Sequence, residues 1–109
     1  MKELEVILPA GGGFPSVEAV DALLKHSGLR ITLRGTLAQY PGSVHWHLKR
    51  AEQPGVLELT HWREGKRVWF AMQDGRRATW VMQSAGELKR QIELTVAKSP
   101  SSAKDRRRS

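Results

Sequence analysis

The sequence predicts an α+β fold: a single domain with an antiparallel meander sheet of about five to six strands, one helix after the first strand and one C-terminal helix. Three observations support this prediction. A helical period follows the first apolar run, the period then changes to two over four successive segments, and turn residues separate those segments. A chain of 109 residues has room for one modest core. We therefore expect the element order β-α-β5-α.

The N-terminal part of the chain predicts a strand, a loop and a helix. Residues 4–8 are apolar at most positions and precede Pro9, which ends the strand. The three glycines at 11–13 form a connecting loop, and Ser16 is placed to cap a helix that ends near Gly28. The helix would bury the apolar side chains of Val17, Val20, Leu23 and Leu24.

Four consecutive segments then alternate between apolar and polar residues, which predicts strands with one buried face. A two-residue turn at 64–65 sets the register of the last hairpin and places Thr60 opposite Trp69. In the first hairpin we expect Gly35 opposite Trp46. The side chains expected to face the core are Ile31, Leu33, Leu37, Val44, Trp46, Leu48, Leu57, Leu59, His61, Val68, Phe70 and Met72.

The C-terminal part predicts a further strand and the second helix. Residues 77–83 alternate so that Trp80 and Met82 would face inward, after a turn at 74–75. Ser84 and Glu87 have the spacing of a capping box, so we expect the helix to start there. Its buried stripe would be Leu88, Ile92 and Val96.

The composition indicates a basic, cytoplasmic protein with a polar tail. There are no cysteines, and neither a signal peptide nor a membrane-spanning segment is evident. The formal net charge is +7; residues 29–77 carry nine Lys or Arg against four Asp or Glu, and residues 98–109 carry five against one. We therefore expect a folded domain over 1–97 and a disordered basic tail over 98–109.

The leading functional prediction is a small, non-enzymatic binding protein that engages single-stranded nucleic acid through the polar face of its sheet. Cations there would contact phosphates, and tryptophan rings would stack on bases. The basic tail would add phosphate contacts without sequence preference. The residues predicted to form this site are Arg34, His47, Lys49, Trp62, Arg67 and Trp69.

Two other binding functions stay open. The first is a protein-interaction or regulatory module that uses the same face or an edge strand, since an unpaired sheet edge invites strand addition. The second is a small ligand between the sheet and the first helix, with Trp46 and Trp80 among its walls.

A metal site is the last candidate, and we expect neither a metal nor another cofactor. His45 and His47 are two residues apart on a strand and therefore point to the same side. One register places Glu58 opposite His47 and completes a set of three ligands, whereas another places Thr60 there. Phosphate binding by the glycines at 11–13 is a separate possibility that we do not expect, because these glycines lack the Gly-Lys-Ser/Thr ending of a phosphate-binding loop.

Overall fold

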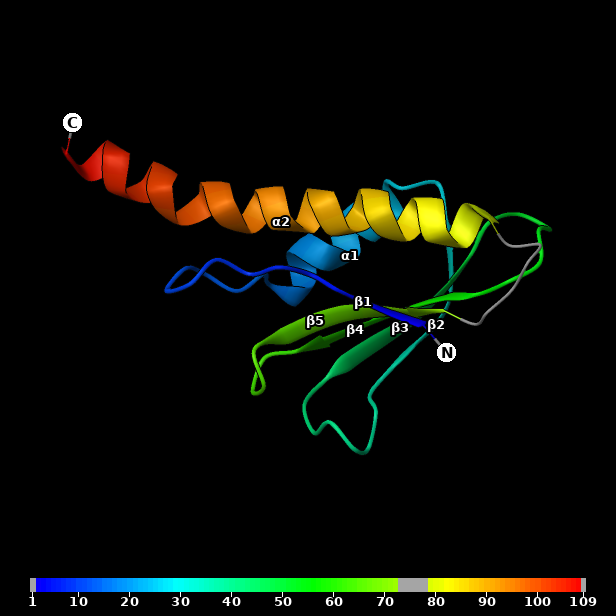
Figure 1. Cartoon of the computed structure of the whole chain (residues 1–109). Coiled ribbons are helices and arrows are strands. Elements are labelled where there is room, and N and C mark those ends of the chain that lie inside the picture. Colours follow the sequence, from blue (N-terminus) through cyan, green and yellow to red (C-terminus); the bar gives the residue numbers. More distant parts are fainter. Residues whose placement is uncertain (1, 73–78, 109) are drawn as a thin grey trace.

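Five strands form one antiparallel sheet, and two helices lie across the same face of it (Figure 1). The computed structural model describes the backbone of residues 2–72 and 79–108 and the side chains within residues 2–72 and 79–96. The predicted α+β class is confirmed, with one helix after the first strand and one at the C-terminus. In chain order the elements are β1 (Lys2–Glu5), α1 (Val17–Lys25), β2 (Arg30–Gly35), β3 (Val44–Lys49), β4 (Leu57–Trp62), β5 (Arg67–Met72) and α2 (Thr79–Arg108).

The sheet is a meander of β2 to β5 to which β1 is added beside β5, giving the order β1-β5-β4-β3-β2. The register predicted for the last hairpin is confirmed, with Thr60 opposite Trp69 and Trp62 opposite Arg67. The positive φ in its turn falls on Lys66, at +53°. Because β1 joins the meander, the sheet reaches five strands without a contribution from residues 79–83, which lie in α2.

The strand predicted over 77–83 and the helix start predicted at Ser84 are both wrong, since α2 begins at Thr79. Trp80 and Ser84 are buried one helical turn apart, and the same spacing of four continues through the predicted stripe of Leu88, Ile92 and Val96. Met82 is exposed instead of facing inward. The short alternation around Trp80 fits both periods, and burial of a continuous helical stripe decides between them.

Helix α1 forms where the sequence predicts it. The Ser16 hydroxyl oxygen accepts a hydrogen bond from the Ala19 amide at 3.1 Å, and Gly28 has φ +87° after the last turn. His61 on β4 is buried on the apolar face, as predicted, and its Nε2 donates to the Pro15 carbonyl at 2.7 Å. This bond attaches the start of α1 to the middle of the sheet.

Strand β2 departs from the predicted register because it contains an irregularity between Ile31 and Leu33. Gly35 lies opposite His45, not Trp46, and Arg34 lies opposite Trp46. An extra residue in a strand sends every later side chain to the other face. As a result Leu33 is 46% exposed on the face away from the helices. Leu37, predicted to continue this strand with its side chain toward the core, lies beyond the end of the strand.

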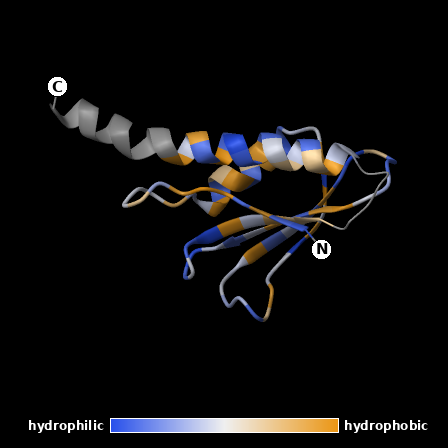
Figure 2. Cartoon of the chain, viewed as in Figure 1, coloured by the Kyte–Doolittle hydropathy of each residue, from blue (hydrophilic) through white to orange (hydrophobic). Residues whose placement is uncertain are grey.

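The core fills the space between the helices and the sheet, and apolar segments recur along α2 and the strands in Figure 2. Trp46 and Phe70 are completely buried, and Trp80 is 3% exposed. The Trp80 Nε1 donates to the Pro54 carbonyl at 2.7 Å. Trp46 and Trp80, considered above as walls of a ligand site, therefore pack in the core.

Some predictions fall outside the described residues. The turn at 74–75 is among them, and so are all side chains of the tail over 98–109, although the bounds of α2 run to Arg108. The domain boundary at 97 and the disorder of the tail therefore stay predictions. Within the described residues, no helix combines the length and apolar character that a membrane span requires.

Candidate binding surfaces

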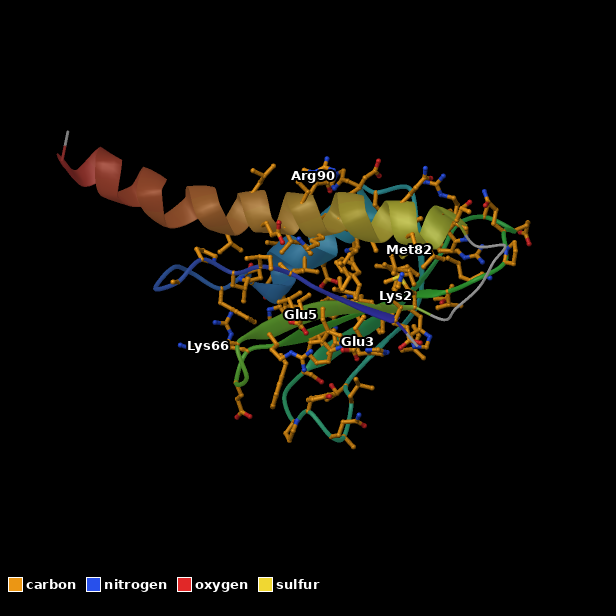
Figure 3. All side chains as sticks on the ribbon, in the orientation of Figure 1. Lys2, Glu3, Glu5, Lys66, Met82 and Arg90 are labelled. Atoms are coloured by element: carbon orange, nitrogen blue, oxygen red, sulfur yellow. The ribbon has the colours of Figure 1, made fainter. Side chains whose placement is uncertain are left out.

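The face of the sheet turned away from the helices, here called the outer face, carries five of the six residues predicted to bind nucleic acid; Arg34 is the exception. The strand registers place on this face Arg30, Leu33 and Gly35 of β2, His45, His47 and Lys49 of β3, Glu58, Thr60 and Trp62 of β4, Arg67, Trp69 and Ala71 of β5, and Glu3 and Glu5 of β1. Glu3 and Glu5 are labelled in Figure 3.

The two tryptophans of the outer face are contacted by the loop between β2 and β3. The Tyr40 ring packs edge-on against Trp62 and Trp69, with centroids 4.9 and 5.0 Å away. The Trp62 Nε1 donates to the Pro41 carbonyl at 3.0 Å. Trp69 is only 4% exposed, and the Arg67 guanidinium carbon lies 3.9 Å from its ring centroid. Trp69 therefore cannot stack on a base unless Tyr40 or Arg67 moves, and only Trp62 is partly exposed.

Arg67 is already paired with carboxylates. It forms an ion pair and two hydrogen bonds with Glu5, and Glu3 lies within 3.8 Å of the same guanidinium. The two glutamates come from β1, an element whose pairing with β5 the sequence does not reveal. They offset the positive charge that the nucleic-acid prediction assigns to Arg67.

Arg34 lies on the helix side of the sheet, because the irregularity in β2 turns its side chain to that face. Its Nε and a terminal nitrogen donate to the Asp21 carboxylate of α1 at 3.2 and 2.9 Å. The same carboxylate accepts from Trp46 Nε1 at 2.8 Å. The hydrogen bond from Arg34 holds the pKa of Asp21 below its ordinary value, with a further contribution from Trp46 and partial burial opposing both. Arg34 thus joins α1 to the sheet.

Positive charge on the outer face gathers at one corner instead. Arg30 is exposed at the start of β2, and Lys49 lies directly opposite it on β3. Arg50 follows in the chain, and the Lys49 ammonium group donates to the Gln53 carbonyl at 3.2 Å. The sequence prediction missed Arg30, although its alternation with Ile31 signals an outward position.

The outer face also brings together His45, His47 and Glu58. The two imidazole Nε2 atoms are 3.1 Å apart, and the His45 Nε2 is 3.5 Å from a Glu58 carboxylate oxygen. One ligand atom from each residue lies within 4.8 Å of the other two. The register that completes the set is the one observed, with Glu58 opposite His47, while Thr60 lies opposite His45.

His45 is the most enclosed member of this cluster, at 6% exposure. Its Nδ1 is 2.7 Å from the Thr60 hydroxyl oxygen, which is also buried. Burial lowers the pKa of His45; the nearby Glu58 carboxylate acts against this, and His47 reinforces it. A neutral imidazole is the form that offers a lone pair to a metal ion.

A hollow of about 340 Å³ lies between α2 and the segment after β1, and the sequence analysis did not predict it. Ile7, Pro9, Arg90, Glu93 and Leu94 line it. Leu94 stands two residues from the buried stripe at 88, 92 and 96, which is the signal that could have placed it outside the core. The glycine loop at residues 11–13 begins with a turn, in which the Gly12 amide donates to the Pro9 carbonyl at 3.0 Å.

Comparison with known proteins adds no identification. The chain matches no family model, and no curated protein or solved structure matches it. Its function must therefore be inferred from these surfaces alone.

Proposed function

We propose that this chain is a small, non-enzymatic binding protein that engages a protein partner at the β1 edge of its sheet and in the hollow beside it. The observation that carries the proposal is the exposure of Ile7 and Leu94, at 65% and 54%, in one shared hollow. Clustered apolar side chains with a polar rim are typical of interaction surfaces. Here Arg90 and Glu93 supply charges of both signs at that rim.

Side-chain contacts give the hollow a fixed shape. The Ile7 amide donates to the Glu93 carboxylate at 2.7 Å, and the Lys89 ammonium group lies 2.7 Å from the same oxygen. Partial burial alone would raise the pKa of Glu93, but the hydrogen bonds from Lys89 and Ile7, together with the Lys89 charge, hold it below its ordinary value. Glu93 therefore stays ionised at neutral pH and keeps the segment after β1 against α2.

Strand β1 adds a second means of binding. It is the last strand of the sheet on its side, so one row of its backbone groups has no strand partner among the described residues. Such an edge can accept an extended peptide, while the neighbouring hollow receives one apolar side chain. A partner that pairs with β1 would reach Ile7, which follows that strand by two residues.

The test compares two substitutions that each introduce a negative charge at an exposed position of α2. Leu94→Asp places a carboxylate in the hollow. Met82→Asp introduces the same charge at a residue of α2 that is 47% exposed and lies outside the hollow. The full chain and both variants carry an affinity tag and are incubated with cell extract. Excess untagged wild-type chain competes for specific partners, and size-exclusion chromatography detects binding to a second copy.

The expected result is a partner, or a second copy, that binds wild type and Met82→Asp and is lost with Leu94→Asp. Both substitutions alter exposed side chains, so far-UV circular dichroism should show the same fold for all three proteins. Equal binding by all three, or a partner lost with Met82→Asp alone, would contradict the proposal.

Single-stranded nucleic acid is the second candidate, and the positive charge at the corner of the outer face where Arg30 lies opposite Lys49 favours it. Arg30, Lys49 and His47 lie on neighbouring outward positions of β2 and β3, where they can contact successive phosphates. The measurement is a titration of fluorescent single-stranded RNA at low and physiological salt with wild type and Lys49→Ala. Binding that weakens with salt and with Lys49→Ala supports this candidate, and salt-independent binding contradicts it.

A further inference from the structure

The protein-partner proposal does not involve the cluster of His45, His47 and Glu58, and the nucleic-acid candidate uses only His47 of the three. From its geometry we infer that these three side chains bind a divalent transition-metal ion, with Zn²⁺ as the ion that fits them best. The site is distinct from the Ile7–Leu94 hollow, so it can be tested whether or not a protein partner binds there.

The separations of the ligand atoms suit one small ion. Zinc–nitrogen and zinc–oxygen bonds of about 2.1 Å in a tetrahedral arrangement place adjacent ligand atoms about 3.4 Å apart. The observed separations are 3.1 Å between the two imidazole Nε2 atoms and 3.5 Å from His45 Nε2 to the Glu58 oxygen. The third separation is at most 4.8 Å. Small side-chain rotations therefore close the site, without movement of the backbone.

The sheet holds the ligands in place before any ion binds. His45 and His47 are two residues apart on β3, and Glu58 is directly opposite His47 on β4. Both strands lie inside the sheet, with a neighbour on each side. A site on paired internal strands varies less in geometry than one on loops. The cluster thus has little backbone entropy to lose on binding.

A second layer of contacts orients His45. The Thr60 hydroxyl, 2.7 Å from Nδ1, fixes the rotation of the ring so that Nε2 faces His47 and Glu58. A hydrogen bond to the far nitrogen of a ligating histidine is a common feature of metal sites. Gly35 lies opposite His45 on β2, and a Cβ built there would meet no heavy atom within 4 Å. The β2 position directly opposite His45 therefore contributes no side chain over that ring.

The donor set selects the class of ion. Two imidazoles and one carboxylate suit Zn²⁺ and its neighbours in the transition series, whereas Mg²⁺ and Ca²⁺ prefer oxygen ligands alone. Three protein ligands leave one tetrahedral position for water. His47 and Glu58 are partly exposed, which gives an ion and its water a route from solvent.

The experiment titrates the full chain with Zn²⁺ in competition with a chromophoric chelator. The variants are His47→Ala and Glu58→Gln, which remove ligands, and Thr60→Val, which removes the hydroxyl beside His45. His26→Ala is the control, because His26 lies at the end of α1, where its Nδ1 contacts the Ala22 carbonyl. Circular dichroism confirms the fold of each variant, and Co²⁺ absorption reports the coordination geometry independently.

We expect one Zn²⁺ per chain, an unchanged affinity in His26→Ala and a tetrahedral Co²⁺ spectrum. Loss of a ligand in His47→Ala should weaken binding by more than about 100-fold, and Thr60→Val should weaken it by about 10-fold or more. Wild-type affinity equal to that of a folded His47→Ala would overturn the assignment. Loss of binding in His26→Ala would overturn it as well. Because Leu94→Asp should bind Zn²⁺ normally, failure of this site and failure of the partner proposal are distinguishable.

Discussion

The Asp21 carboxylate should be one of the most important polar groups for the stability of this fold. It accepts hydrogen bonds from Trp46, which is completely buried, and from Arg34, whose side chain is about half exposed. These contacts join α1 to β2 and β3. We predict that Asp21→Ala destabilises the protein strongly, that Asp21→Asn does so moderately, and that Arg34→Ala does so least.

The magnitudes follow from burial. Asp21→Ala leaves the Trp46 indole N–H without a partner, which costs about 1–3 kcal/mol for a buried donor. It also removes an ion pair to a half-exposed arginine, worth about 0–1 kcal/mol. Together we expect about 2–3 kcal/mol, or roughly 10–20 °C in Tm for a domain of this size. Asp21→Asn keeps an oxygen for the indole and should cost about 1 kcal/mol, and Arg34→Ala should cost less than about 1 kcal/mol.

The assay is urea unfolding followed by far-UV circular dichroism, which reports the whole fold. Glu18→Ala is the matched control, because it removes an exposed carboxylate from the same helix. It should change the free energy of unfolding by less than about 0.5 kcal/mol. The reasoning is refuted if Asp21→Ala is as stable as Glu18→Ala, or if Arg34→Ala costs as much as Asp21→Ala.

The same carboxylate predicts a pH dependence. Asp21 has a folded-state pKa below its ordinary value of 3.8, chiefly because Arg34 donates to it. Its contribution to stability is therefore complete above the unfolded-state pKa and is lost as the pH falls through the folded-state pKa. The difference in unfolding free energy between wild type and Asp21→Asn should be constant near neutral pH and should shrink below pH 3.8.

Three further predictions concern backbone positions, two in the turn between β4 and β5 and one in α2. Gly65→Ala would place a Cβ in steric conflict with the Trp62 ring, and it should cost about 1–3 kcal/mol in urea unfolding. Gly86→Ala, where nothing lies within 4 Å, should instead stabilise α2 by about 0.5–1 kcal/mol, and the same sign for both would contradict the packing argument. Lys66→Gly relieves a φ of +53° and should leave Tm unchanged or raised; a drop of several degrees would show that the Lys66 side chain stabilises the turn.

The candidate metal cluster shows how far sequence reasoning reaches at a site. Alternation along β3 places His45 and His47 on one side, but it leaves open whether Glu58 or Thr60 lies opposite His47. The observed register places Glu58 opposite His47 and Thr60 opposite His45, so one residue completes the ligand set and the other supports it. Alternation alone cannot choose between registers that differ by two residues, because both keep the same side chains on the same face.

The sequence by itself determined the local elements and the direction of most side chains, because period and turn chemistry are properties of neighbouring residues. Ser16 caps α1, the turn at 64–65 sets the last hairpin, and His61 faces the core, all as predicted. Tertiary structure decided the rest, because the deciding partner is remote in the chain. The register shift in β2 turns Arg34 toward Asp21, and Tyr40 packs against Trp69 from a loop of no regular period. The outer face, which the local pattern predicts to be exposed, is thus partly covered by side chains that are remote in the sequence and come together only in the folded chain.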